Sequence, residues 1–366
     1  MRVEIITLHS VANYGTQLQA LATQKKLSEY FDDVEFIDFR RSDTYGIGLF
    51  KTFSRGNFLR GLASLPTLLI WHFKFGFFQK KYLNLSEKKY LNEDGLKMFN
   101  ERADYYVVGS DQVWNTGWNH GVIPAYYLNF IDDSKPKFSF SSSFGMNHLE
   151  EKDVPFVKKY LRGFKCISVR EPSGVDIVKN QLGLNNVVQL VDPVLSLPAS
   201  YWRKMGSDID TSQKYILVYS LNRNKNLDDF AVKISKKTGF KLIRFCTRVD
   251  QILRPGKGLV IPNILDFITL IDNAECVITD SFHATAFSML MNTPPICVYP
   301  EKYSNRISEF LKLVDENERH LKDYEDFDII NRRVDFKKVN SILERERNRV
   351  DVYLEKAIDG QDGVKQ

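Results

Sequence analysis

The residues best suited to chemistry lie in the stretch 277–290, which reads V-I-T-D-S-F-H-A-T-A-F-S-M-L. The apolar run that opens it is typical of a buried parallel strand. Thr279, Asp280 and Ser281 are N-cap residue types, and the sequence after them predicts a helix. His283 is therefore expected in the first helical turn, just beyond the C-terminal end of a strand. Ligands bind at this place in open α/β sheets.

The chemistry available to His283 depends on an anion. Free backbone N–H groups and the helix dipole both favour negative charge at a helix N-terminus. The dipole disfavours the imidazolium form while no anion is bound, and a bound anion reverses that balance. His283 could then donate a proton at neutral pH. The alternative is a histidine that only hydrogen-bonds within the fold.

A second polar cluster follows a strand predicted at 104–108 and reads G-S-D-Q-V-W-N. Its position at a strand end again indicates a ligand site. Asp111 could accept a proton from a hydroxyl group or hydrogen-bond a sugar, and Trp114 offers a face for stacking. The alternative for Asp111 is an Asx turn or a helix cap.

A third candidate is the loop 9–15, which joins a strand to a helix predicted at 16–30. It has one glycine, so it lacks the G-x-G-x-x-G pattern of dinucleotide-binding loops. Asn13 and Gly15 could shape a turn that contacts a sugar or a phosphate. The favoured alternative is a simple connector with Gly15 at positive φ.

Composition limits the classes of protein. With 366 residues, 43% of them hydrophobic and 27% charged, the chain is typical of a soluble globular protein of two domains. A net charge of +5 suits an acidic small substrate or an anionic lipid surface. We expect no nucleic acid partner, because the charge is small and no RNA-binding or zinc-finger motif is present.

Four cysteines lie far apart without a C-x-x-C pair, which indicates free thiols of a cytosolic protein. They are Cys166, Cys246, Cys276 and Cys297. No His and carboxylate cluster has metal-ligand spacing, so we expect no metal. The chain opens on a strand pattern, so we expect no signal peptide. No apolar run has membrane-spanning length, so we expect no transmembrane helix. The expected location is the cytoplasm, with peripheral contact at the inner membrane face.

Strands and helices alternate in both halves of the chain, which indicates two parallel α/β domains. A connection with Pro and Ser at 192–200 marks the boundary. We expect domains at 1–198 and 199–335, followed by a charged helix and tail at 336–366.

An insertion at about 42–92 breaks this alternation. It is rich in Phe, Leu and Trp, and it has no Asp or Glu from residue 49 to residue 86. Such a mixture is typical of an interfacial amphipathic hairpin on anionic lipid. Phe73, Phe75, Phe77 and Phe78 could enter the headgroup boundary. The alternatives are a helical insertion packed on the domain or an oligomer contact. The interleaved basic residues are Lys51, Arg55, Arg60, Lys74, Lys80 and Lys81.

Together these pieces resemble the polysaccharide pyruvyl transferase family. The matching segments follow the family order from residue 13 to about residue 313. They are N-Y-G-T-Q-L-Q-A-L-A (13–22), V-V-G-S-D-Q-V-W-N (107–115), I-S-V-R-E (167–171), V-D-P (191–193), T-D-S-F-H-A (279–284) and R-I (306–307). Each is weak alone, whereas their order makes the resemblance specific.

The resemblance implies two Rossmann-like domains that face each other across a cleft, as in glycosyltransferases of the B type. It also implies the reaction: the enolpyruvyl group of phosphoenolpyruvate (PEP) joins two hydroxyls of one sugar as a ketal, and phosphate is released. PEP would be a co-substrate, and no cofactor is needed. The sugar would belong to a bacterial surface glycan on a polyprenyl diphosphate carrier, at an anionic membrane face.

Residue roles follow from the matching motifs. His283 would donate the proton, and Asp111 would serve as a base on the acceptor side. Some family members have an arginine two residues before the histidine, where this chain has Ser281. The PEP anion would then be held by helix N–H groups together with Ser281, Arg170, Arg223 and Arg306. Acceptor contacts are expected from Asn13, Gly15 and Trp114 on the N-terminal domain.

Arg170 also has a simpler alternative, an ion pair with its neighbour Glu171. Two other functions remain open for the chain as a whole. One is a nucleotide-sugar glycosyltransferase of the same architecture, and the other is a non-catalytic glycan-binding relative.

Overall fold

The computed structural model describes residues 1–301 and 305–359. The chain forms two compact units. Unit 1 contains Met1–Leu65, Phe75–Ser196 and the chain from Glu346 onward, whereas unit 2 contains Pro66–Lys74 and Leu197–Arg345. The main crossing of the chain from unit 1 to unit 2 therefore lies between Ser196 and Leu197, two residues before the predicted domain boundary.

Unit 1 is built on a parallel sheet of five strands in the order β3-β2-β1-β4-β5. This order is that of a Rossmann-like half. The strands are β1 (Arg2–Ile6), β2 (Asp33–Phe39), β3 (Leu85–Tyr90), β4 (Tyr105–Val108) and β5 (Lys137–Ser139). Isolated parallel bridges Phe138–Cys166 and Ser142–Val169 extend it to the pair β6 (Ile167–Val169) and β7 (Val187–Gln189).

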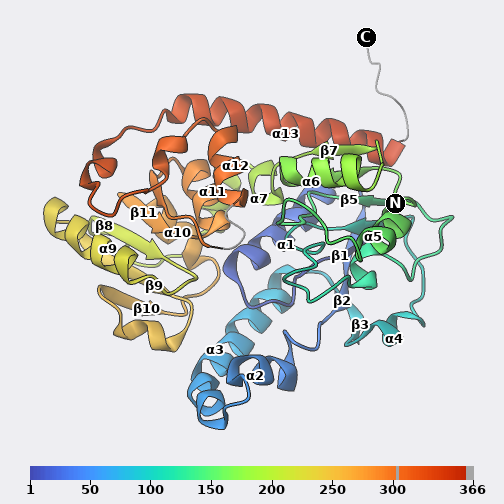
Figure 1. Cartoon of the computed structure of the whole chain (residues 1–366), viewed down its shortest axis with the longest axis horizontal. Helices are drawn as coiled ribbons and strands as arrows, with labels where there is room; N and C mark the ends of the chain where they lie inside the picture. Colours follow the sequence, from blue (N-terminus) through green and yellow to red (C-terminus); the bar gives the residue numbers. More distant parts are fainter. Residues whose placement is uncertain (302–304, 360–366) are drawn as a thin grey trace. The chain divides into compact units, whose positions relative to one another are not determined.

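The helices of unit 1 connect these strands (Figure 1). They are α1 (Tyr14–Leu27), α2 (Gly46–Ser54), α4 (Glu93–Leu96), α5 (Val154–Leu161), α6 (Pro172–Asp176) and α7 (Pro193–Ser196). Helix α1 begins two residues earlier than predicted, because the Asn13 side chain accepts the backbone N–H of Thr16 as an N-cap. It ends at Leu27, three residues before the predicted end.

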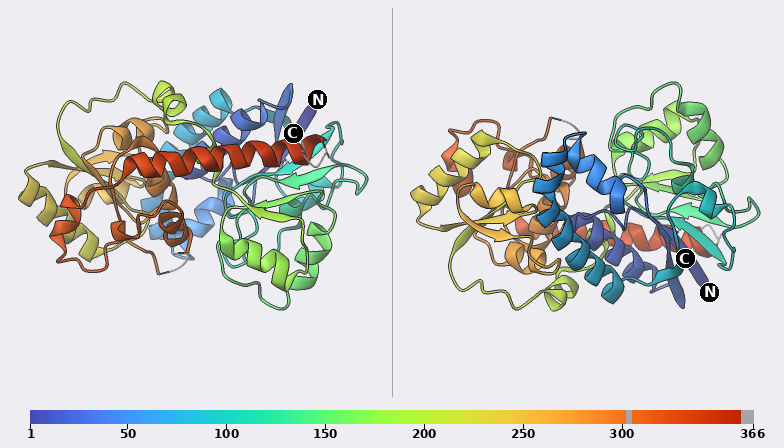
Figure 2. Two further views of the ribbon diagram at one scale, coloured as in Figure 1. Left: turned by 90° about the horizontal axis from the view of Figure 1, so that it is seen from above. Right: turned by 90° about the horizontal axis from the view of Figure 1, so that it is seen from below.

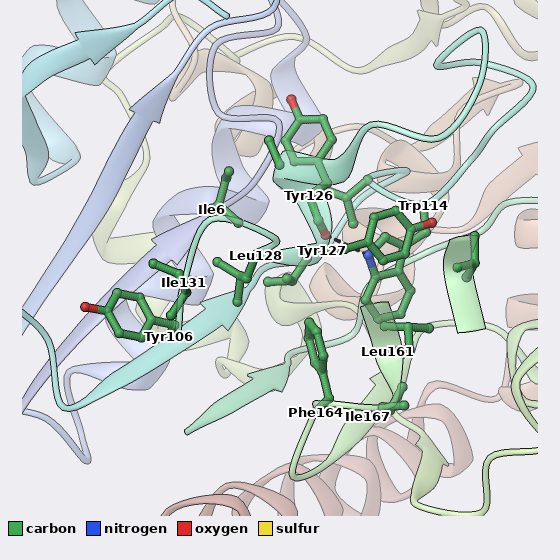
Figure 3. Close-up of a cluster of buried hydrophobic side chains, with 14 of the residues drawn as sticks. Ile6, Tyr106, Trp114, Tyr126, Tyr127, Leu128, Ile131, Leu161, Phe164 and Ile167 are labelled. Carbon is green, nitrogen blue, oxygen red and sulfur yellow. Dashed lines mark hydrogen bonds between the residues drawn. The ribbon is translucent and has the colours of Figure 1, made fainter. Parts of the chain in front are cut away.

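A large aromatic cluster forms the core at one side of this sheet (Figure 3). Trp114, Tyr126 and Tyr127 belong to it and are almost fully buried. The indole Nε1 of Trp114 donates a hydrogen bond of 2.8 Å to the carbonyl of Tyr126, and its ring stacks on Tyr127 at 5.6 Å. The segment after β4 is therefore fixed by packing.

Unit 2 repeats the same architecture with strands in the order β10-β9-β8-β11-β12. The strands are β8 (Tyr215–Tyr219), β9 (Lys241–Cys246), β10 (Lys257–Val260), β11 (Cys276–Thr279) and β12 (Pro295–Cys297). The helices are α8 (Ala199–Met205), α9 (Lys225–Thr238), α10 (Asp266–Asp272), α11 (Phe282–Met291) and α12 (Asn305–Leu313). A separate apolar core supports this sheet, with Ile216, Val218 and Ile278 among its members.

The last helix, α13 (Phe336–Asp359), is one unbroken element, seen in red in Figure 2. Its first ten residues belong to unit 2 and the rest to unit 1. The predicted separate C-terminal segment is therefore part of both units.

The predicted insertion at about 42–92 contains α2 and the long helix α3 (Phe58–Tyr82). Its last part forms β3, a strand of the unit 1 sheet, so the predicted helical segment extends too far. Its central part, Pro66–Lys74, is counted in unit 2. The side chains of Phe75 and Phe78 are buried, so the prediction that they enter a lipid headgroup layer is wrong. Lys74 Nζ donates to the carbonyl of Ile261 at 2.6 Å, so it is not free to contact lipid. Among the described helices, none combines the length and apolarity needed to cross a membrane.

Candidate functional site

In unit 2 the candidate site is built where β11 passes into α11. Ser281 is the N-cap of α11, and its Oγ accepts the N–H of Ala284 at 3.4 Å. Its carbonyl accepts both the N–H and the Oγ1 of Thr285. His283 is the second residue of the helix and is 6% exposed, with its ring 5.2 Å from that of Phe282. The histidine thus lies at the carboxyl edge of the sheet, in the first turn of the helix.

Asp280, directly before the N-cap, joins this edge to the neighbouring strand. Its carboxylate accepts the backbone N–H groups of Leu221 and Asn222 at 2.7 and 2.9 Å, and the Asn222 amide at 2.9 Å. Burial raises the pKa of Asp280, although these N–H groups favour its charged form. Because β8 and β11 are the adjacent strands at which the winding of the sheet reverses, Asp280 fixes the loop at the usual ligand position.

Arg306 is the second residue of α12, and Phe310 lies one turn further along the same helix face. The ring of Phe310 packs against Phe282 at 5.8 Å. Arg306 therefore belongs to the side of α12 that contacts the start of α11, as a clamp for an anion near His283 requires.

Arg223 lies in the loop that follows β8. Its side chain is 76% exposed, and Nη2 is 3.0 Å from Asp250 Oδ2. Such an exposed pair is weak, so the guanidinium can change partners at little cost. Four of the expected donor-side residues thus belong to unit 2: Ser281, His283, Arg223 and Arg306.

In unit 1 the polar residues gather where β1 and β4 end. Asp111 has a positive φ of 70°, which is uncommon for a residue other than glycine and occurs often at functional sites. Its Oδ2 accepts Thr16 Oγ1 at 2.6 Å, and its Oδ1 accepts the N–H of Gln112 at 2.9 Å. Asn13 caps the same turn of α1 that contains Thr16. The structure therefore brings Asn13 and Asp111 together at the point where the sheet of unit 1 reverses its winding.

Arg170 is buried next to this turn and is surrounded by carboxylates of unit 1. Its Nε is 2.9 Å from Glu171 Oε1, its Nη1 is 2.6 Å from Asp192 Oδ2, and its Nη2 is 3.9 Å from Asp111 Oδ1. Burial alone would lower the pKa of Arg170, but the carboxylates raise it above its ordinary value. The simpler alternative for Arg170, a pair with Glu171, is thus present as a buried network.

Sequence reasoning gave Glu171 a role only as the alternative ion-pair partner of Arg170, and it assigned none to Asp192 or to the serines between residues 139 and 143. Ser143 Oγ donates to Glu171 Oε1 at 2.7 Å, and Ser110 Oγ donates to the carbonyl of Ser141, which has a φ of 52°. The available signal was the position of Glu171 and Asp192 within the I-S-V-R-E and V-D-P segments.

Two acceptor-side predictions need correction. Trp114 has no exposed surface, and Tyr127 covers one face of its ring, so the predicted stacking face for a sugar is wrong (Figure 3). Gly15 lies in the first turn of α1 and does not have a positive φ, so the favoured connector hypothesis fails in that detail. Asn13 acts as a helix cap, which leaves its amide nitrogen for other contacts.

Across residues 1–301 and 305–359, no three His, Cys, Asp or Glu side chains are grouped as a metal site would require. All four cysteines are free thiols. Burial raises the pKa of Cys246, Cys276 and Cys297 to about 11, 12 and 11, which makes these thiols unreactive at neutral pH.

The fold and the two strand-edge sites define a protein of two Rossmann-like domains, like the glycosyltransferase B type. Similar solved structures have this architecture. One is a UDP-N-acetylglucosamine 2-epimerase of Listeria monocytogenes, described as putative (12% identity, TM-score 0.51, 100% of this chain and 98% of that one). Another is S. aureus MnaA with UDP (11% identity, TM-score 0.55, 99% and 98%). At such identities the likeness shows the fold alone.

The sequence identifies the family within this class. The family model of polysaccharide pyruvyl transferase matches residues 13–302, and the chain belongs to that family. It is thereby a transferase of polysaccharide biosynthesis. A search of curated proteins gives no match.

Proposed function

We propose that the protein is a PEP-dependent transferase that forms a pyruvate ketal on a sugar of a bacterial surface glycan. The observation that supports this most directly is the position of His283, in the first turn of α11 at the carboxyl edge of its sheet. An anion bound at this helix end would hold the substrate beside a proton donor. The family assignment supports transfer of a pyruvyl group to a polysaccharide.

The reaction balances with one proton donor and two hydroxyls. His283, as imidazolium, gives a proton to the methylene carbon of PEP, and C2 becomes electrophilic. The first sugar hydroxyl adds to C2, the C2–O bond to phosphate breaks, and the second hydroxyl closes the ketal. Of the two hydroxyl protons, one restores His283 and the other leaves with phosphate as hydrogen phosphate. No oxidant or reductant is required.

Charge recognition would come from four groups in unit 2. The N-terminal end of α11 favours an anion through the helix dipole, and Arg306 and Arg223 supply cations. Ser281 Oγ already accepts a backbone N–H, but this bond is long at 3.4 Å, and its hydroxyl proton remains available as a donor. Asp280 keeps the adjacent loop in place.

The acceptor would bind to unit 1, at the turn of α1 that contacts Asp111. The Asp111 carboxylate would accept hydroxyl hydrogen bonds or a proton, and the Asn13 amide would add a donor. In this proposal Arg170 positions Asp111 together with Glu171 and Asp192, rather than binding PEP itself. The acceptor would be linked to a polyprenyl diphosphate, and the enzyme would work in the cytoplasm at the inner membrane face.

The decisive experiment replaces His283 by Gln, which keeps size and polarity but removes the proton. Turnover, measured as phosphate released from PEP in the presence of acceptor, should fall by roughly 10²–10⁴-fold. The exposed His148→Gln variant is the matched control and should keep full activity. In heavy water the wild-type product should carry deuterium in its methyl group.

Near-normal turnover of the His283→Gln variant would refute the proton-donor role. Sugar transfer from a UDP- or GDP-sugar, with no phosphate released from PEP, would instead support the nucleotide-sugar alternative. Acceptor binding with neither activity would indicate a non-catalytic relative.

A further inference from the structure

Helix α3 presents an apolar stripe that no part of the described chain covers. Six residues spaced by three or four positions define this α3 stripe, and each is exposed. This spacing places them on one helix face. They are Phe58, Leu62, Leu65, Leu69, Phe73 and Phe77, with exposed fractions from 36% to 70%. Large exposed apolar patches mark interaction surfaces.

The opposite face of α3 is fixed by specific contacts. Thr67 Oγ1 accepts the N–H of Val249 at 3.1 Å, and Trp71 Nε1 donates to the carbonyl of Thr247 at 2.8 Å. Phe75 and Phe78 are buried on that side. The helix thus has a second apolar face in addition to the packed one, and it cannot rotate to bury the stripe without breaking these contacts.

Exposed cations lie in the same segment of the chain as the α3 stripe. The segment 49–86 contains no Asp or Glu. Lys80 and Lys81 lie on the exposed surface of the last turn of α3, and Arg60 is exposed in its first turn. Helix α2 adds exposed Lys51, and its C-cap residue Arg55 is also exposed. An apolar face with cations beside it complements a surface that has anionic groups at the outside and an apolar layer beneath them.

We propose that α2 and α3 form a docking surface for an anionic lipid bilayer, with the α3 stripe at the boundary between headgroups and acyl chains. The stripe spans 19 residue steps, about 29 Å along a helix at 1.5 Å per residue. An exposed helix face of this length suits a flat membrane surface. Ile47 of α2, which is 77% exposed, extends the apolar area.

A second copy of this chain is a poorer occupant. In a symmetric dimer the same patch meets itself. The exposed cations of both copies would then face each other, with no carboxylate of residues 49–86 to offset them. An anionic lipid surface removes this repulsion.

The test measures binding to vesicles without PEP or sugar, so its failure would leave the proposed reaction untouched. Full-length protein should float with phosphatidylcholine vesicles that contain phosphatidylglycerol, at low salt. Binding should weaken at high salt and be lost on pure phosphatidylcholine. The Lys80→Glu/Lys81→Glu variant should lose about tenfold or more in partitioning.

The apolar contribution needs its own variant. Phe73→Ser/Phe77→Ser should reduce partitioning at any salt concentration, because it removes the inserted rings. Met98→Ser/Leu253→Ser changes two apolar residues outside α2 and α3 that are even more exposed than Phe73 and Phe77, and it should bind as wild type. Lys179→Glu/Lys236→Glu is the corresponding charge control, and it should also keep most of the binding.

Two outcomes would overturn the proposal. One is wild-type protein that ignores phosphatidylglycerol vesicles at low salt. The other is a wild-type dimer in analytical ultracentrifugation that Phe73→Ser/Phe77→Ser converts to a monomer, which would assign the stripe to a second copy.

Discussion

At the scale of single residues, the surroundings of Arg170 lead to a sharp prediction. Its guanidinium contacts the carboxylates of Glu171 and Asp192 in a buried site. Replacing Arg170 by Gln would leave these charges without a cation, which should lower the free energy of unfolding by about 3–5 kcal/mol. Arg170→Lys should not restore the stability, because one ammonium group cannot reproduce the hydrogen bonds of the planar guanidinium group.

Urea unfolding of Arg170→Gln checks this, with the exposed Arg223→Gln as the matched control that should lose little stability. If Arg170 instead clamps PEP, the variant would be as stable as wild type and would lose PEP affinity alone. Calorimetric titration of PEP distinguishes the two results.

The predictability of single residues depended on how local their roles are. His283 and Ser281 lie where the sequence predicted, because a strand followed by N-cap residue types determines the first helical turn. Trp114 was misassigned because the tyrosines that cover it come from a different segment. Arg170 meets Asp192 22 residues away, and a local pattern cannot show such a partner.

At the scale of elements, two glycines of α3 should respond differently to replacement by alanine. A Cβ at Gly76 would meet nothing within 4 Å, whereas one at Gly61 would lie 2.6 Å from Cζ of Phe50 on α2. Gly76→Ala should therefore stabilise the helix by about 0.5–1 kcal/mol through propensity alone. In Gly61→Ala, displacement of the Phe50 ring should offset this gain.

Hydrogen exchange of the α3 amides, followed by mass spectrometry, reports such local changes. Amide exchange in Gly76→Ala should slow by roughly two- to fivefold, because a stabilisation of about 0.5–1 kcal/mol lowers the exchange rate by this factor. An equal slowing in Gly61→Ala would mean that α2 does not pack on α3 through Phe50.

The elements themselves were predictable where the hydrophobic period was clear. Strand β10 was not predicted, because K-G-L-V is short and contains a glycine that weakens strand signals. The insertion was recognised as amphipathic, but its sequence could not show which phenylalanines pack inward. Phe75 and Phe78 do so, whereas Phe73 and Phe77 remain exposed.

At the scale of the whole molecule, the repeated strand–helix alternation predicted two parallel α/β domains, and the connection with Pro and Ser predicted a boundary two residues after Ser196. It did not predict that residues 66–74 and 336–345 join unit 2. These segments belong to unit 2 because they contact residues that are far away in the sequence, as Trp71 contacts Thr247. Local periodicity contains no information on such pairs.

The two proposals assign chemistry and docking to different parts of the chain, so their effects should be separable. His283 lies on α11, and the exposed cations Lys80 and Lys81 lie at the end of α3. With a lipid-linked sugar acceptor in anionic vesicles, Lys80→Glu/Lys81→Glu should lower the rate, because less enzyme reaches the surface. With a short water-soluble glycoside, the same variant should react as wild type.

His283→Gln should lower the rate with both acceptors, since the proton is needed wherever the sugar is held. Parallel assays of phosphate release with the two acceptors make this comparison. If the Lys80→Glu/Lys81→Glu variant loses the same fraction of its rate with the soluble and the vesicle acceptor, these lysines serve the reaction or the fold instead of docking. High salt should reproduce the variant's defect in wild-type enzyme only with vesicles, because screening weakens attraction to the anionic surface.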